Sequence, residues 1–178
     1  MRRQHLMRGS RQLGVTLVEL VIGVAILGIL AGIAVPSYTT FIANTQIRST
    51  TESIRNGLQV ARAEAVKRNA TVTFTLNTNR SWVVGCPTVT ANCPATIQSK
   101  AANEGGSGTV TVNPNSGSTN PVTFTNLGGA TLYDVTVDNT SIAAANSKDL
   151  RVRVGAGGNV RVCDPNISVT TDTRYCAA

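Results

Sequence analysis

The chain has 178 residues, a formal net charge of +7, 42% hydrophobic residues and a single histidine, His5. This length leaves room for one folded domain with a real core, but not for two, once a membrane segment is set aside. Because no histidine follows residue 5, and Glu64 and Glu104 form no recognisable acid pair, we expect neither an enzyme nor a cofactor.

A basic N-terminal segment precedes a long apolar run. Residues 1–14 hold four arginines and no acid, whereas residues 15–35 contain only two polar side chains, Thr16 and Glu19. At about 1.5 Å per helical residue, such a run spans the roughly 30 Å hydrocarbon core of a bilayer. The positive-inside rule then places the N-terminus in the cytoplasm. The sequence predicts a single-pass inner-membrane protein with its C-terminal head in the periplasm.

Glu19 is the one carboxylate in the apolar run. A charged residue deep in a membrane helix costs about 2.5 to 3.5 kcal/mol on insertion scales, so a partner is expected. A cation on the same or a neighbouring helix could neutralise it. The alternative is a polar residue tolerated near the membrane interface without a partner.

The residues around Glu19 resemble the type IV prepilin leader, in which a basic segment ends in glycine and is followed by a hydrophobic residue, a polar or small one, two apolar residues and a glutamate. Here the pattern is Gly14, Val15, Thr16, Leu17, Val18 and Glu19. The resemblance implies cleavage after Gly14 by the prepilin peptidase and N-methylation of Val15, which replaces the more common phenylalanine. Cleavage would give Val15 an α-amino group, whose ordinary pKa is about 8, four residues upstream of Glu19. It also implies that the apolar helix forms the filament core, where Glu19 sets the register between subunits.

An ordinary secretory signal is the alternative interpretation of the same segment. Gly32, Ile33 and Ala34 would supply its small-x-small cleavage site. The apolar run is longer than the usual 7 to about 15 residues of such signals and contains an acid, which argues against this interpretation.

The helix is predicted to continue from about residue 16 to Arg68, where Lys67 and Arg68 complement the helix dipole and Asn69 can form a left-handed cap. Pro36 should kink this helix rather than end it. An amphipathic seam that faces a partner layer consists of Ile47, Thr51, Ile54, Leu58, Ala61 and Ala65. A stripe of Arg48, Arg55 and Arg62 on another face is interpreted as solvated rather than as a binding surface.

Beyond Ala70 the sequence alternates in the way typical of strands. Strands are predicted at residues 71–77, 81–85, 108–112, 121–126, 130–137, 150–154 and 159–163. The glycine-rich residues 155–158 predict a hairpin turn rather than a phosphate loop, and residues 103–108 and 113–121 predict surface loops.

These patterns predict an α+β fold in four parts. They are a leader at 1–14, the membrane or filament-core half of the helix at 15–35, its amphipathic half at 36–69 and a β-rich head at 70–178. A long N-terminal helix that packs on a sheet-rich C-terminal head is the type IV pilin fold that the leader implies.

All four cysteines follow the apolar run, so in an oxidising periplasm they should be paired. Three connectivities exist for four cysteines. The pairs Cys86–Cys93 and Cys163–Cys176 close short loops flanked by turn residues, and we predict these two bridges. A metal site is the alternative, but the spacings are not those of C-x-x-C pairs, so no metal is expected.

Within pilins, the chain resembles the FimT/FimU minor pilins and the GspH pseudopilins. The resemblance rests on residues 58–74, 122–130 and 150–165. It implies a low-abundance pilus subunit in the complex that primes assembly, at or near the tip, with other minor pilins and the major pilin as partners through the N-terminal helix. Pilus biogenesis, twitching motility and adhesion would depend on it. A minor pseudopilin of type II secretion is an alternative with the same fold.

DNA binding is the second alternative, because some FimT-type members bind DNA through a Gly-Arg-x-Arg element. The matching residues 158–161 have Asn159 in place of the first arginine. Candidate contacts are Arg151, Arg153, Arg161 and Arg174. Nearby acids dilute this patch, and removal of the leader leaves 12 basic against nine acidic residues, a net charge of +3. The basicity is therefore mainly a targeting property, and a polyanion partner is not favoured.

Overall fold

The computed structural model describes residues 14–102, 104 and 107–176. The leader other than Gly14, and residues 103, 105 and 106 of one predicted surface loop, lie outside the described residues. The chain divides into two compact units, Met1–Tyr38 and Thr39–Ala178. The four-part division drawn from the sequence stays a proposal.

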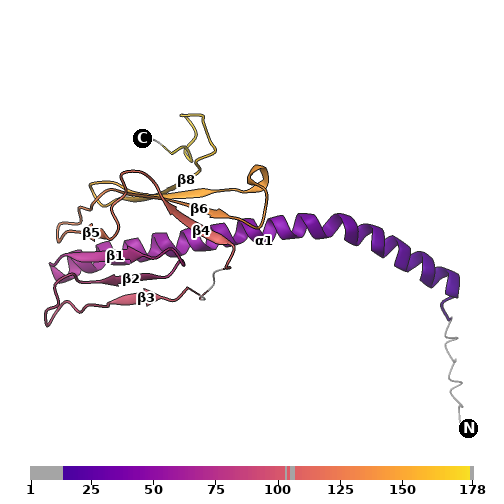
Figure 1. The fold of residues 1–178 in the computed structure, drawn as a ribbon, viewed down its shortest axis with the longest axis horizontal. Coiled ribbons are helices and arrows are strands. Elements are labelled where there is room, and N and C mark those ends of the chain that lie inside the picture. The colour runs from indigo at the N-terminus through magenta and orange to yellow at the C-terminus, as the bar shows by residue number, and fades with distance from the viewer. Residues whose placement is uncertain (1–13, 103, 105–106, 177–178) are drawn as a thin grey trace, which may run out of the picture. The chain divides into compact units, whose positions relative to one another are not determined.

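Helix α1 (Leu17–Arg68) begins at the start of the apolar run and continues through Pro36, as predicted (Figure 1). Thr16 caps it: the Thr16 carbonyl accepts the first helical hydrogen bond from Leu20 N–H, and its hydroxyl accepts one from Glu19 N–H at 3.2 Å. In the first unit no described residue is buried, and α1 contains a stretch long and apolar enough to cross a membrane, with mean hydropathy 2.6.

The part of α1 that belongs to the second unit is amphipathic, and all six residues of the predicted seam are buried. The seam is therefore confirmed. The helix ends at Arg68, and Asn69 has φ = 48°, the left-handed conformation expected of the cap.

Two antiparallel sheets make up the rest of the second unit. The first has the order β3-β2-β1-β5 and consists of β1 (Val72–Leu76), β2 (Trp82–Gly85), β3 (Gln98–Lys100) and β5 (Val122–Phe124). The second has the order β4-β6-β7-β8 and consists of β4 (Val110–Pro114), β6 (Tyr133–Asn139), β7 (Leu150–Val154) and β8 (Val160–Cys163). A short 3-10 helix, η1 (Ala144–Asn146), lies between β6 and β7.

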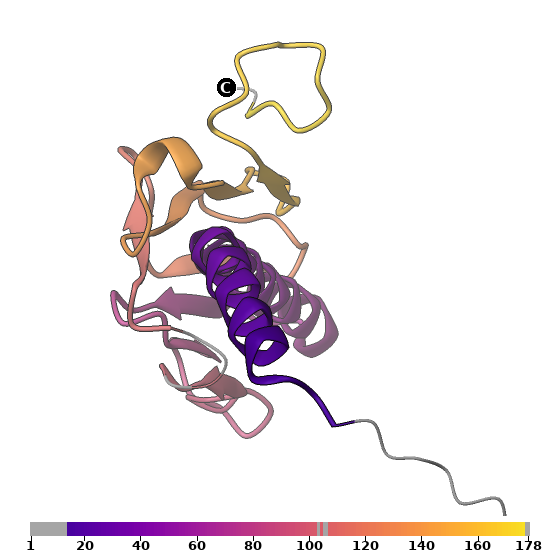
Figure 2. The ribbon, with the colours of Figure 1, turned by 90° about the vertical axis from the view of Figure 1, so that its right-hand side faces the viewer.

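One hydrophobic core joins the seam of α1 to the inward faces of both sheets. Figure 2 shows the strands on different sides of the helix within this unit. Helix α1 and strand β1 approach each other closely at Gly57. A Cβ atom there would lie 2.6 Å from a Phe74 ring carbon, so glycine fits best at this position. Side chains fix the helix at both sheets: Trp82 Nε1 donates to Ser53 Oγ at 3.0 Å, and Asn139 Nδ2 donates to Gln46 Oε1 at 3.0 Å.

All seven predicted strands are present, but their bounds differ and one further strand exists. Strand β3 was not predicted because its residues, Gln98–Lys100, are polar, largely exposed and at the edge of a sheet, so they lack the alternation that marks a half-buried strand. Strand β4 extends to Pro114, into a predicted surface loop, because a sheet edge tolerates a proline. The predicted hairpin between β7 and β8 is confirmed.

Candidate functional site

The proposed processing junction is accessible. Gly14 and Val15 have no helical or strand structure, and Val15 is 70% exposed. The helix begins only at Leu17, so the bond between Gly14 and Val15 lies in extended or irregular backbone of the kind that a peptidase can bind.

Glu19 is exposed in the first turn of α1, and it forms no ion pair with another described residue. The structure adds a local function for the pair Thr16 and Glu19 that sequence reasoning missed. Thr-x-x-Glu is the signature of a capping box, and its first half is present in the bond from Glu19 N–H to the Thr16 hydroxyl. A carboxylate in a first turn also interacts favourably with the positive end of the helix dipole.

The apolar part of α1 presents its side chains on all sides. Val18, Val21 and Ile26 are typical, with exposed fractions of 65%, 56% and 53%. A helix that is apolar on all sides is normally buried, either in a membrane or among other protein segments. This surface is the largest exposed apolar feature among the described residues.

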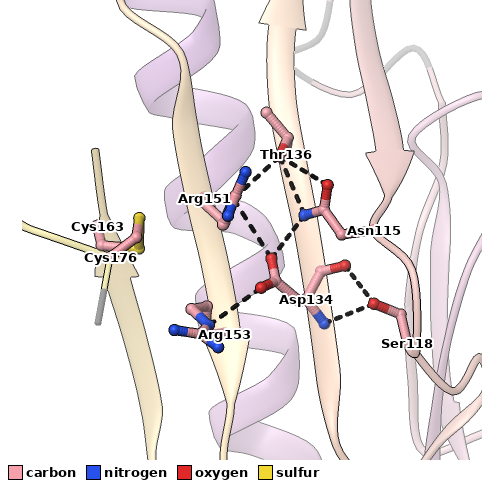
Figure 3. A network of polar contacts seen from close by, with 8 residues as sticks. All are labelled: Asn115, Ser118, Asp134, Thr136, Arg151, Arg153, Cys163 and Cys176. Atoms are coloured by element: carbon pink, nitrogen blue, oxygen red, sulfur yellow. Dashed lines mark hydrogen bonds and ion pairs between the residues drawn. A yellow bond between two sulfur atoms is a disulfide. The ribbon is translucent and has the colours of Figure 1, made fainter. Parts of the chain in front are cut away.

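Two arginines of the candidate DNA patch, Arg151 and Arg153, lie on strand β7 of the second sheet and share one carboxylate (Figure 3). Arg153 Nε lies 3.0 Å from Asp134 Oδ2, and Arg151 Nε lies 3.5 Å from Asp134 Oδ1. Strand register explains the cluster, because Asp134 on β6 is directly opposite Arg153 on β7. Sequence reasoning missed Asp134, although its place in an alternating strand put it on the same face as the arginines.

Asp134 is held by further polar contacts (Figure 3). Asn115 Nδ2 donates to Asp134 Oδ1 at 2.6 Å, and Ser118 Oγ and the Asp134 backbone exchange hydrogen bonds. Thr136, opposite Arg151, accepts a hydrogen bond from Arg151 Nε at 3.3 Å. This network holds both arginine side chains against the sheet through their Nε atoms, with one carboxylate offsetting part of their charge.

The other two candidate arginines differ from each other. Arg174 forms an ion pair with Asp172 at 2.9 Å, which lowers the pKa of Asp172. Arg161 on β8 is directly opposite Arg153, is exposed and has no ion pair within the described part of the chain. The structure therefore brings Arg151, Arg153 and Arg161 together on neighbouring strands. Of the four candidates, all but Arg161 have a carboxylate partner among the described residues.

Both disulfides of the sequence prediction are present, Cys86–Cys93 and Cys163–Cys176. The first closes a loop whose Asn92 carbonyl accepts a hydrogen bond from Arg68 at the end of α1. The second holds the C-terminal segment against β8, where Asp164 N–H donates to Arg174 O at 2.8 Å. Among the described residues, no three histidine, cysteine or acidic side chains gather closely enough to hold a metal ion.

The arginine stripe on α1 is exposed, as expected, but Arg62 also makes specific contacts. Its Nε donates to Gly128 O and its Nη2 to Gly157 O, each at 3.3 Å. These two carbonyls belong to the loop after β5 and to the β7–β8 hairpin, so Arg62 joins one loop from each sheet to the helix. Glycine is required at 158, where φ is +71° and a Cβ atom would lie 1.9 Å from Gly128 O.

A pair of carboxylates, Asp138 and Asp149, shares the hydroxyl of Ser147 at 2.7 and 2.6 Å. Burial, together with the neighbouring carboxylates, raises the pKa of Asp149. Burial alone would also raise the pKa of Asp138, but hydrogen bonds from Ser147, Asp149 and Asn139 N–H bring it below its ordinary value. No local pattern predicts this pair, because Asp138 lies at the end of β6 and Asp149 directly before β7.

Comparison with known proteins places these features in a family. Residues 50–158, more than half of the chain, match the family described as Type II transport protein GspH, and residues 9–35 match the Prokaryotic N-terminal methylation motif. The chain belongs to the GspH family. It carries the N-terminal motif of prepilins together with a GspH-type head, as the sequence resemblance implied.

Solved structures show that this GspH-family chain has the type IV pilin fold. The minor pilin FimU of Pseudomonas aeruginosa is 16% identical and covers 71% of this chain and 97% of its own, with a TM-score of 0.56. The minor pseudopilin EpsH from the Type 2 Secretion System of Vibrio cholerae is 12% identical, covers 68% and 99%, and has a TM-score of 0.54. The predicted α+β fold of a long N-terminal helix on a sheet-rich head is confirmed.

A curated relative matches only a short part of the chain. The Type IV major fimbrial protein FimA of Dichelobacter nodosus is 49% identical over 55 residues, which is 31% of this chain and 34% of that protein. The chain thus spans about a third of the length of the curated relatives that it matches. Activities and partners of those proteins do not transfer on this likeness alone.

Proposed function

We propose that this GspH-family chain is a minor subunit of a type IV pilus, in the complex that primes assembly at or near the tip. It would support pilus biogenesis, twitching motility and adhesion, and its role would be structural rather than catalytic. One observation carries the proposal. Directly after an accessible Gly14–Val15 junction, α1 exposes apolar side chains on all sides. Such a surface must be covered, by lipid before assembly and by other subunits afterwards.

The proposed sequence of events follows from this surface. The prepilin peptidase cleaves between Gly14 and Val15, and Val15 is N-methylated. The apolar helix of residues 15–35 first anchors the subunit in the inner membrane, with the head in the periplasm. It then enters the filament core beside other minor pilins and the major pilin, where Glu19 pairs with an α-amino group. In this scheme residues 36–69 are the amphipathic half of the helix, which packs on the β-rich head of residues 70–178.

Substitutions of Glu19 test the charge pair. Glu19→Ala should leave membrane insertion intact but lower incorporation into filaments by about tenfold or more, because breaking a buried ion pair leaves one charge unpartnered. The measurement is the ratio of the subunit in sheared filaments to that in membranes.

Glu19→Gln is the matched control for the capping box. Glutamine retains the capping ability of glutamate but lacks its charge, so it separates helix capping from ion pairing. If the charge pair drives assembly, both variants fail. Normal incorporation of Glu19→Gln would contradict the pair and assign Glu19 to the helix cap.

A minor pseudopilin of type II secretion is the second candidate, favoured by the match of residues 50–158 to the family described as Type II transport protein GspH. The two machines have different outputs. Deletion of the gene should abolish surface pili and twitching if the pilus assignment is right. Loss of exoprotein release with normal pili would assign the chain to secretion instead.

A further inference from the structure

A groove of about 570 Å³ lies on the second unit between α1 and the β7–β8 side of the second sheet. Its two walls come from distant parts of the sequence. The α1 wall includes Phe41, Arg48 and Arg55, and the opposite wall includes Lys148, Leu150 and Val162. The groove is therefore a product of the fold and not of one exposed loop.

The groove contains an apolar site. Leu150 and Val162 are partly buried and pack against the hydrophobic core. Together with Phe41, which is 66% exposed, they form the apolar part of the groove lining. A single exposed aromatic ring needs no explanation, but one that shares a groove with two aliphatic side chains can hold an apolar side chain of a partner.

The charges in the groove are not balanced. Its lining contains four cations and two acids, Glu52 and Asp164. Two of the cations have carboxylate partners, since Arg48 lies 3.6 Å from Glu52 and Arg174 pairs with Asp172. Arg55 and Lys148, one on each wall, are exposed and form no ion pair with any described residue. An acidic side chain bound in the groove would meet these two cations.

We propose that this groove binds a segment of another pilin-type subunit, one that places an acidic residue beside an aliphatic or aromatic one. The proposal rests on the proposed function, because the groove wall belongs to the same helix that would pack against other subunits in the filament. A DNA strand fits less well: Glu52 and Asp164 line the groove and would repel successive phosphates, whereas one acidic side chain contacts only the two unpaired cations.

Photo-crosslinking in host membranes tests this docking surface with the full-length chain. A benzophenone amino acid at position 41 should crosslink to another pilin-type subunit, and mass spectrometry should map the crosslink to a segment with an acidic residue. Arg55→Glu and Lys148→Glu should each lower the yield about tenfold or more, because a like charge then opposes the acid. Replacement of the partner's acid by lysine should restore the yield with Arg55→Glu.

Arg161→Glu is the matched control, because Arg161 is likewise exposed and without an ion pair among the described residues but lies on β8 outside the groove lining. It should leave the crosslink unchanged. Formation of both disulfides, read as protection of the four cysteines from thiol alkylation until they are reduced, reports that each variant has folded.

A second crosslinker at Ile26, in the apolar part of α1, separates this proposal from the proposed function. Crosslinks to pilin-type subunits from position 26 but not from position 41 would overturn the groove and leave the subunit role standing. Their absence at both positions would overturn the subunit role. A crosslink from position 41 to phospholipid or DNA, or one that Arg55→Glu does not weaken, would also overturn the groove.

Discussion

At the scale of single residues, the Asp138–Ser147–Asp149 arrangement shows how one shared hydroxyl separates the pKa values of two carboxylates. The Ser147 hydroxyl has one proton but lies within hydrogen-bond distance of both carboxylates. As the pH falls, a proton taken up by Asp149 would satisfy both contacts, since Asp149 could then donate to Ser147 while Ser147 donates to Asp138. The raised pKa of Asp149 and the lowered pKa of Asp138 agree with this arrangement.

The pair predicts opposite pH effects for two matched variants. Asp149→Asn should raise stability at pH 7, because the amide replaces a carboxylate whose charge burial disfavours, and the gain should vanish as the pH falls toward and below the ordinary value of 3.8. Asp138→Asn should lower stability at pH 7, because the stabilised charged form is lost, and this loss should vanish as the pH falls through the lowered pKa of Asp138.

The measurement is the melting temperature of the full-length protein in detergent between pH 3 and about 8, which spans the ordinary range of carboxylates. Each variant serves as the control for the other, because both remove one negative charge from the same cluster. A shift of the same sign for the two variants at pH 7 would contradict the opposite directions of the two pKa shifts.

At the scale of elements, Arg62 predicts which member of the α1 stripe matters for stability. Arg62→Met retains the aliphatic stem and the helix propensity but removes the two hydrogen bonds to Gly128 O and Gly157 O. Because the side chain is exposed, we expect a loss of about 1 kcal/mol in the free energy of unfolding. Chemical denaturation of the full-length protein in detergent measures it.

Arg55→Met is the control, since Arg55 lies two helical turns earlier on the same stripe and contacts neither loop. It should change the free energy of unfolding by less than about 0.5 kcal/mol. Equal losses in the two variants would show that the two hydrogen bonds from Arg62 to the loops add nothing measurable to stability.

The same elements show what a sequence can reveal. The seam of α1 and the strands β1 and β7 were predictable, because alternation and helical periodicity record which face is buried. Strand β3 was not, since an exposed polar edge strand leaves no such pattern. The Gly14–Glu19 motif is contiguous and could be found from sequence, whereas the contacts of Asp134 and Arg62 depend on strand register and loop placement, which no local pattern encodes.

At the scale of the whole molecule, charge pairing argues against a DNA-binding role for the arginine patch. The candidate patch holds four arginines, but Asp134 engages two of them and Asp172 a third. These carboxylates lower the net positive charge that a phosphate would meet, which reduces the favourable free energy from counterion release. Only Arg161 offers an unengaged guanidinium among the four.

We therefore expect the processed chain, residues 15–178, to give no salt-sensitive retardation of duplex DNA at micromolar protein in a gel-shift assay. Asp134→Asn should induce or strengthen retardation, because it releases Arg151 and Arg153 while keeping most of the polar network of Asn115 and Ser118. Glu52→Gln is the control: it changes the net charge by the same amount but frees Arg48 on α1, outside the candidate patch. It therefore separates an effect of net charge from an effect of the patch. Strong binding by the unaltered chain, lost in Arg161→Ala and insensitive to Asp134→Asn, would show that Arg161 suffices and that the carboxylates do not suppress binding.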